Sequence, residues 1–419
     1  MRFGIVALGS QGDVHPLVAL GAGLVGAGHR VRVAANDSYQ ALIRGQGLDY
    51  APVAGDPQGS LTDTASQKNA YYKGHRALSR GRDMKRAPVD EIAQVARDCL
   101  QACQDADVIV SGVPGLPVAF HIAEKTGALL VRGFPYPTRL AGRFQRAKLA
   151  VFRQFYWFFL RGLTNTVRRE VLGLPPLSWA DPFRQLDEQH RPALFSFSTA
   201  VVPRPYDWGD WMHVTGYWFL PPSAWQPPAD LLAFLEAGPA PVVVTFGSQH
   251  GPEAEAMTDL TLEALKQTNR RGVLVTGWGA LRGSGANGDL FALEWAPFDW
   301  LFQRAAAVVH HGGAGTTALA LRGGAPSVVV PFYRDQAFWG QRVRALGAGA
   351  RPIPYRELTA ERLASAIHEV LGDPDMRLRA SAIGQRIAAE DGVGEAVRIL
   401  ENACAHSGKA VVGAGDGGR

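Results

Sequence analysis

The chain is 419 residues long and 47% hydrophobic, which is enough to bury two ordinary cores, so we expect two domains of about 200 residues each. Its formal net charge of +5 is small for this length; it permits attraction to phosphates or to an anionic membrane surface but does not indicate a nucleic-acid-binding protein. The three cysteines, Cys99, Cys103 and Cys404, are too few and too badly spaced for a disulfide framework or a zinc site, which indicates a reducing cytoplasm.

The first apolar run covers residues 3–8 and is followed at once by a glycine. It is too short for the core of a signal peptide and is typical of a buried parallel strand. No uninterrupted apolar run of 18 residues occurs elsewhere, so we expect no membrane-spanning helix.

The first quarter of the chain alternates between strand and helix patterns. We predict a turn over 9–15 and a helix over 16–26, with Pro16 in the first turn, where proline is favoured. A strand is expected at 29–35, and the alternation continues through 128–132. This order predicts an α/β fold with a doubly wound parallel sheet.

Two cationic segments interrupt or decorate this pattern. Residues 55–86 are polar and rich in Lys and Arg, which is typical of a mobile solvated loop; a lid over an acceptor is the alternative. Residues 126–169 contain nine Lys or Arg and no acidic residue, around the aromatic run VFRQFYWFFL at 151–160. That run could line an apolar acceptor pocket, dock on an anionic bilayer, or be a buried helix with cations at its edges.

The second half of the chain opens as the first does. A proline-rich linker is expected over 221–240, and PVVVTFGSQHG at 241–251 then echoes FGIVALGSQGD at 3–13. Both read as a strand that runs into a Gly-Ser-Gln turn. The repetition indicates two Rossmann-like domains that face each other.

The stretch VVHHGGAGTTALALRGGAPSVVVP, 308–331, reads as a strand, a tight turn and a helix that begins near Thr316. A helix start offers unpaired N–H groups and the positive end of the helix dipole, and Gly312, Gly313 and Gly315 allow a ligand to approach the backbone closely. A diphosphate fits such a site.

The same turn also matches the GxGxxG/A pattern of dinucleotide-binding proteins, with Asp335 at about the distance of a ribose-binding acid. An NAD(P)-dependent oxidoreductase is therefore an alternative. Against it, the pattern lies late in the chain, and Asp335 stands four residues beyond Pro331 rather than at a strand end.

Residues 295–343, from WAPFDW to WGQRV, closely resemble the donor-sugar signature of the family 1 glycosyltransferases, the UDP-glycosyltransferase superfamily of the GT-B fold. GSQGDVHPLVALG at 9–21 and VVVTFGSQ at 242–249 fit the same family. The chain is most similar in pattern to sterol 3-β-glucosyltransferases and to bacterial antibiotic and natural-product glycosyltransferases.

The resemblance implies a GT-B fold, in which two Rossmann-like domains, each a doubly wound parallel sheet, face each other across a cleft. We predict that the chain divides into five regions along its length. They are an acceptor-binding domain (1–220), a linker (221–240), a nucleotide-sugar-binding domain (241–380), C-terminal helices that cross back to the first domain (381–405) and a disordered tail (406–419).

The resemblance also implies which residues bind the donor. These are Ser248, Trp295, His311, Gly313, Gly315, Thr316, Asp335 and Gln336. The family's diphosphate contacts match His311, Gly315, Thr316 and Ser248, whereas Asp335 and Gln336 match the pair that binds sugar hydroxyls. Trp295 matches the base-stacking aromatic, with Phe298 as the alternative. Leu319 stands where plant members have a ribose-binding Glu, so ribose recognition must come from elsewhere.

The catalytic base implied by the resemblance is Asp13, because QGDVHP here replaces the QGHxNP of plant relatives. The Asp that supports the plant histidine is also missing, since Ser111 and Gly112 stand in its place. His15 is the rival base, and an electrostatic role of Asp13 at a helix start is the structural alternative.

The remaining expectations concern the substrates and the state of the enzyme. His15, Phe134 and Trp157 are candidate acceptor contacts. We expect no metal and no cofactor, because the pairs Asp105/Asp107 and Asp373/Asp375 are placed as solvated turns.

The expected reaction is inverting transfer of a hexose from UDP-glucose, or alternatively of a TDP-deoxysugar, to a hydroxyl of a sterol, hopanoid or polyketide. A non-catalytic nucleotide-sugar binder is a further alternative. We expect a cytoplasmic monomer or weak homodimer, with peripheral contact to the inner face of the membrane as an alternative location, and no nucleic-acid partner.

Overall fold

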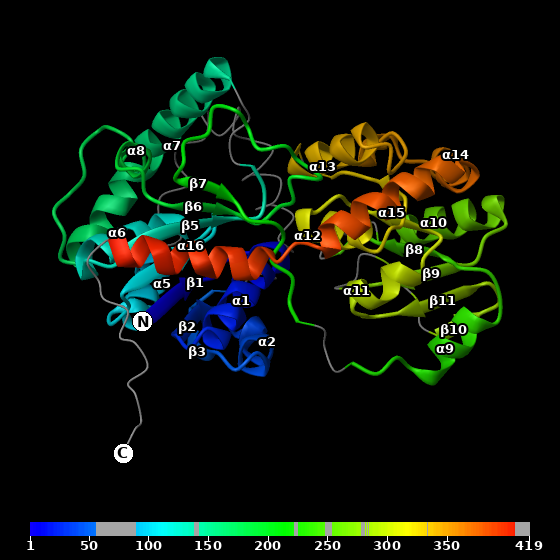
Figure 1. Cartoon of the computed structure of the whole chain (residues 1–419), viewed down its shortest axis with the longest axis horizontal. Coiled ribbons are helices and arrows are strands. Elements are labelled where there is room, and N and C mark those ends of the chain that lie inside the picture. The colour runs from blue at the N-terminus through cyan, green and yellow to red at the C-terminus, as the bar shows by residue number, and fades with distance from the viewer. Residues whose placement is uncertain are drawn as a thin grey trace.

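The computed structural model describes residues 1–55, 89–137, 142–221, 225–247, 254–277, 281, 283, 285–332 and 334–406. Figure 1 shows two α/β domains side by side, with the last helix lying on the first domain. Most of the cationic segment 55–86, the tail from 407 onward and Ser248 lie outside these residues.

The N-terminal domain is built on a seven-stranded sheet in the order β3-β2-β1-β4-β5-β6-β7, in which every pairing is parallel. Its strands are β1 (Arg2–Val6), β2 (Arg30–Ala35), β3 (Asp49–Pro52), β4 (Val108–Ser111), β5 (Leu129–Phe134), β6 (Ala193–Phe195) and β7 (Met212–Val214). Its helices are α1 (Gln11–Gly26), α2 (Gln40–Gly45), α5 (Val89–Cys103), α6 (Leu116–Thr126), α7 (Arg143–Glu170) and α8 (Arg184–Glu188).

The C-terminal domain has a six-stranded sheet in the order β10-β11-β9-β8-β12-β13, parallel except for the hairpin of β10 and β11. Its strands are β8 (Val242–Thr245), β9 (Gly272–Val275), β10 (Gly285–Asn287), β11 (Leu290–Leu293), β12 (Ala307–His310) and β13 (Ser327–Val329). Its helices are α9 (Ala229–Glu236), α10 (Ala254–Thr268), α11 (Phe298–Leu301), α12 (Ala314–Arg322), α13 (Arg334–Ala345), α14 (Ala360–Gly372) and α15 (Pro374–Ala388). The prediction of two parallel-sheet α/β domains is confirmed.

Helix α1 begins earlier than predicted. The turn expected over 9–15 is instead mostly helical, because α1 starts at Gln11 and contains Pro16 in its interior. Ser10 is the N-cap, and Asp13 is the third helical residue of a capping box. The polar Ser-Gln-Gly-Asp run is thus a helix start, and the catalytic candidate lies on a rigid element.

The linker predicted over 221–240 is partly a helix. Residues 229–236 form α9, whose Leu231 and Phe234 are buried in a core cluster with Val243 and Val273 of the C-terminal sheet. Prolines on both sides of α9 favoured the prediction of a linker, although the apolar residues of α9 follow a helical period.

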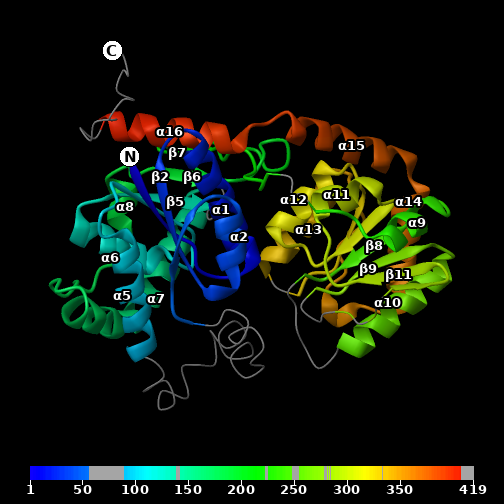
Figure 2. The same cartoon turned by 90° about the horizontal axis from the view of Figure 1, so that it is seen from below.

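The two domains share the last part of the chain. Helix α15 packs on the C-terminal domain, and α16 (Gly392–His406) packs on the N-terminal domain, where Leu400 is in one core cluster with Leu20 and Leu24. Figure 2 shows α15 and α16 following each other along one side of the molecule. The helical structure is interrupted between α15 and α16. Asp391 lies in this interruption, and its carboxylate accepts a hydrogen bond of 2.9 Å from the Gly394 N–H.

The aromatic run at 151–160 lies in the long helix α7, and most of its side chains are exposed although Trp157 is buried, so the interpretation of the run as a buried helix is wrong. Six of its apolar side chains are exposed. Within the described residues, no helix is both long and apolar enough to cross a membrane.

Candidate active site

Asp13 is held at the start of α1 by Ser10. The backbone N–H and the hydroxyl of Ser10 both donate to Asp13 Oδ2, over 3.0 and 2.9 Å. Gly9 makes room for this carboxylate: it has a φ of 111°, and a Cβ there would lie 2.6 Å from Oδ2. These bonds fix one carboxylate oxygen and leave Oδ1 to accept a proton.

The pKa of Asp13 is raised above its ordinary value. Burial is the largest cause, the two bonds from Ser10 oppose it, and the negative charge of Asp335 raises the pKa further. Asp335 belongs to the other domain. Because its charge acts on Asp13, the two carboxylates lie close enough to interact electrostatically. A raised pKa makes Asp13 a stronger base than an ordinary aspartate.

The alternatives to Asp13 are placed less well. His15 lies two residues along the same helix, which points it away from the Asp13 side, and burial lowers its pKa to about 4. The Ser111 hydroxyl donates to the Val6 carbonyl over 3.0 Å, so it stabilises the end of the sheet. Because its hydroxyl is bonded to the backbone, Ser111 does not replace the Asp that supports the histidine base of plant relatives.

The glycine-rich turn joins β12 to α12. Gly313 is the N-cap, so α12 begins two residues before the predicted Thr316. Gly312 has a φ of 86°, and a Cβ there would lie 2.7 Å from a methyl group of Val329; one on Gly313 would lie 2.4 Å from His311 Nε2. Gly315 is exposed on the first turn of α12, where a Cβ would meet no atom within 4 Å. The helix start is therefore open to a ligand.

The two histidines before this turn have different surroundings. His310 is fully buried, its Nδ1 accepts a hydrogen bond of 3.1 Å from the Gly312 N–H, and its pKa is lowered to about 3. His311 is partly exposed, lies against Gly247 and Gly313, and has a pKa lowered to about 4 by burial. Both rings are neutral at pH 7, and His311 is the one that a ligand can reach.

Trp295 lies on the connection between β11 and α11 and is 56% exposed. Its ring meets Trp225 edge to face, with ring centres 6.1 Å apart. The alternative, Phe298, already stacks on Phe302 at 4.6 Å. Of the two candidates, Trp295 is the one with a free ring face for a nucleobase.

Asp335 and Gln336 lie in the first turn of α13. Gln336 is buried, and its side-chain oxygen accepts a hydrogen bond of 2.8 Å from the Phe332 N–H, whereas Asp335 is exposed. Only Asp335 of this pair presents its polar group freely to a sugar. Leu319 packs against a core cluster of the C-terminal domain, so it offers no polar contact to ribose.

The acceptor candidates other than His15 are core residues. Phe134 packs on Phe195 in a buried cluster. Trp157 is 4% exposed and donates a hydrogen bond of 3.2 Å to the Ser178 carbonyl. Neither side chain presents an open surface, so their predicted role in acceptor binding is untested and has no support in these contacts.

The two Asp-x-Asp pairs serve the fold. Asp107 accepts a hydrogen bond of 2.9 Å from the Arg2 N–H, and Asp373 caps α15 by accepting one of 3.1 Å from the Met376 N–H. Across the described ranges, no group of three or more His, Cys, Asp or Glu could hold a metal ion.

Comparisons with known proteins identify the family of this chain. The protein-family description "Erythromycin biosynthesis protein CIII-like, C-terminal domain" matches residues 287–403. The chain is 32% identical over 421 residues to a sterol 3-β-glucosyltransferase of Arabidopsis thaliana, covering 95% of this chain and 67% of that protein. It is 35% identical over 418 residues to the O-mycaminosyltylonolide 6-deoxyallosyltransferase of Streptomyces fradiae, covering 96% and 97%.

The chain belongs to the family 1 GT-B glycosyltransferases. Solved structures agree on the fold: the glycosyltransferase of kitacinnamycin superposes with a TM-score of 0.70 at 22% identity, covering 96% of this chain and 98% of the other. The calicheamicin glycosyltransferase CalG4 gives 0.68 at 18%, covering 97% and 99%. Fungal sterol 3-β-glucosyltransferases are much longer, and the chain spans about 30% of the one from Emericella nidulans.

Family membership makes the chain a glycosyltransferase and sets aside the NAD(P)-dependent oxidoreductase. Two groups beside the site were missed from sequence. Ser10 could have been found, because Ser-x-x-Asp is a helix-start pattern. Trp225 gave no signal, because its contact with Trp295 joins two distant parts of the chain.

Proposed function

We propose that this glycosyltransferase transfers glucose from UDP-glucose to a hydroxyl group of a hydrophobic acceptor such as a sterol, hopanoid or polyketide, with inversion at the anomeric carbon. The names of its relatives support this class, since one names a sterol and another names O-mycaminosyltylonolide. The observation that carries the proposal is the placement of Asp13 at the start of α1, where Ser10 holds Oδ2 and leaves Oδ1 free, with its pKa raised by burial and by the charge of Asp335 from the other domain.

The proposed reaction is a single displacement. Asp13 Oδ1 takes the proton from the acceptor hydroxyl, and the acceptor oxygen forms a bond to the anomeric carbon. The bond from that carbon to the phosphate oxygen breaks on the opposite face. The nucleoside diphosphate leaves toward the start of α12, where free N–H groups, the helix dipole and His311 stabilise its charge.

Two observations favour a second candidate donor, a TDP-deoxysugar. The relative from Streptomyces fradiae, of which this chain covers 97%, is a 6-deoxyallosyltransferase. The glycosyltransferase VinC, which superposes with a TM-score of 0.63 at 20% identity, was solved in complex with dTDP. Leu319 supplies no ribose contact to either donor.

We further propose that the reaction needs no metal, because the helix start and His311 can neutralise the leaving group. A cytoplasmic location fits the three free and buried cysteines. We propose a monomer or weak homodimer in solution.

A screen of donors against sterol, hopanoid and polyketide acceptors, read by mass spectrometry, tests the proposal. Glucosylated product should form from UDP-glucose with EDTA present. Product from TDP-deoxysugars alone would select the second donor, and activity only after adding Mg²⁺ would refute the metal-free step. Protection against thermal unfolding by UDP, without transfer to any acceptor, would favour a non-catalytic binder.

A further inference from the structure

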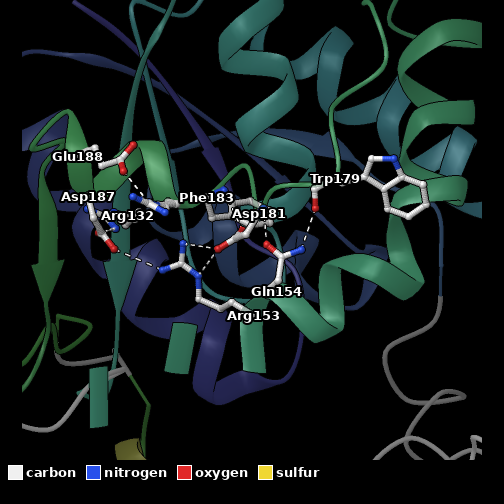
Figure 3. Close-up of polar contacts among 9 residues, drawn as sticks. Arg132, Arg153, Gln154, Trp179, Asp181, Phe183, Asp187 and Glu188 are labelled. Atoms are coloured by element: carbon white, nitrogen blue, oxygen red, sulfur yellow. Dashed lines mark hydrogen bonds and ion pairs between the residues drawn. The ribbon is translucent and has the colours of Figure 1, made fainter. Parts of the chain in front are cut away.

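Helix α7 turns its polar side inward. Arg153 bonds to Asp181 over 2.7 Å and to Asp187 over 3.3 Å, and Gln154 donates a hydrogen bond of 2.8 Å to the Trp179 carbonyl (Figure 3). Further along, the fully buried Arg168 forms an ion pair with Glu124. These contacts fix the rotation of α7 about its axis.

The outward side of α7 is apolar. Six side chains on it are between 45% and 70% exposed: Val151, Phe152, Phe155, Tyr156, Phe158 and Phe159. Their spacing repeats every three or four residues, so they form one stripe along the helix. A helix on a globular protein ordinarily buries such a stripe, and α7 does the reverse.

Trp179 extends this stripe beyond the helix. It is 61% exposed, and its ring centre lies 5.7 Å from that of Phe158. The guanidinium of Arg161 lies over the same indole at 4.0 Å. We call the six side chains and Trp179 the aromatic face.

The charges along α7 as far as Arg169 are all positive, and the one carboxylate of the helix is that of its last residue, Glu170, about three turns beyond Phe159. Residues 126–169 contain no acidic residue. The carboxylates that approach α7 from other segments, Asp181, Asp187 and Glu124, bond to its inward arginines. Lys148 and Arg169 are exposed and, like Arg161, have no ion pair within the described part of the chain.

We propose that the aromatic face of α7 docks on an anionic lipid bilayer, with its rings at the boundary between head groups and acyl chains and the flanking cations on lipid phosphates. Phe, Trp and Tyr among Arg and Lys form the side-chain chemistry of that boundary. A second copy of the chain fits less well, because pairing this face with itself would bring together more cations than carboxylates.

Docking goes beyond glycosyl transfer and does not depend on the donor or acceptor proposed above. If the acceptor is a membrane-resident alcohol, docking also places the enzyme where that acceptor is concentrated.

Vesicle co-sedimentation of the full chain tests the proposal without any substrate. The wild type should bind vesicles of phosphatidylcholine with phosphatidylglycerol and bind pure phosphatidylcholine more weakly. The double variant Phe155→Ser, Phe158→Ser should lose at least about tenfold in binding. Leu378→Ser removes an apolar side chain that is 66% exposed on α15 and should bind as the wild type does.

A charge variant separates the two parts of the contact. Lys148→Glu with Arg169→Glu should weaken binding to the anionic vesicles, and added salt should weaken the wild type in the same way. Unchanged melting temperatures would show that both double variants fold. Failure of the wild type to bind anionic vesicles, or equal binding by the Phe155→Ser, Phe158→Ser variant, would overturn the proposal; a concentration-dependent dimer lost in that variant would assign the face to a second copy.

Discussion

Asp13 combines two requirements that oppose each other. At the helix start it accepts hydrogen bonds from Ser10, which lower its pKa, whereas the proposed role as a base is favoured by burial and by the charge of Asp335, which raise its pKa. Burial and Asp335 raise its pKa, so the folded protein holds a proton on Asp13 more tightly than the unfolded chain does. The stability that this proton contributes is fully present below the ordinary pKa of 3.8 and is lost as the pH rises through the folded value.

This sign predicts opposite effects of Asp13→Asn on activity and stability. The amide can still accept both bonds from Ser10 but cannot take a proton, so turnover should fall by about 10²–10⁴-fold. At pH 7 the variant should melt no lower than the wild type, since it removes a buried charge, and the difference should close at acid pH. Scanning calorimetry and product assays measure both; unchanged turnover would remove Asp13 as the base.

The pH profile tests the interaction between the carboxylates. The acid limb of kcat/KM should lie above 3.8, because activity is lost when Asp13 is protonated. Asp335→Asn removes the neighbouring negative charge, which lowers the pKa of Asp13, so the limb should move to lower pH whatever happens to the rate. His15→Asn is the control and should leave the limb in place; loss of turnover in His15→Asn as large as that expected for Asp13→Asn would assign the base to His15.

At the scale of elements, the turn from β12 to α12 depends on where glycine is required. Gly313→Ala places a methyl group 2.4 Å from His311 Nε2, so we expect a loss of about 1–3 kcal/mol in the free energy of unfolding and weaker donor binding. Gly315→Ala meets nothing and favours the helix by up to about 1 kcal/mol.

Chemical denaturation measures the stability of the Gly313→Ala and Gly315→Ala variants, and UDP titration measures their donor affinity. If the diphosphate lies at this helix start, Gly315→Ala should raise stability and still weaken UDP binding, because its methyl group occupies ligand space. Equal UDP affinity in both variants and the wild type would place the diphosphate elsewhere.

Helices α1 and α7 both differ from what their local sequence patterns favour. Pro16 suggested a helix start, but Ser10 and Asp13 supply bonds that begin α1 five residues before it. For the aromatic run of α7 the sequence left open whether the apolar side faces inward or outward, because apolar stripes are ordinarily turned inward. Ion pairs on its inward side, such as that of the buried Arg168 with Glu124, turn the polar side of α7 inward instead.

At the scale of the whole molecule, the two domains share a buried apolar cluster. One cluster joins Phe195 and Trp208 of the first domain to Leu321 and Trp339 of the second. Arg342 of α13 also donates two hydrogen bonds, of 3.0 and 2.6 Å, to the Val201 carbonyl. The domains therefore stabilise each other.

We predict a single thermal unfolding transition for the full chain. UDP at about 100 times its Kd should stabilise the folded state by about 2.7 kcal/mol, and NAD should not. Calorimetry counts the unfolding transitions. Two transitions, of which UDP shifts only one, would mean that the shared cluster does not couple the domains.

The sequence by itself determined the alternation of strands and helices, the two parallel sheets, the glycine turn before α12 and the family. Each of these depends on local periodicity or on a nearly contiguous motif such as 295–343, where neighbouring residues carry the information. Only the tertiary structure decided that Asp335 lies near Asp13, that Trp225 packs on Trp295 and that α7 faces outward with its aromatic side. Those features depend on how distant elements dock, and docking is set by the summed packing and pairing of whole surfaces.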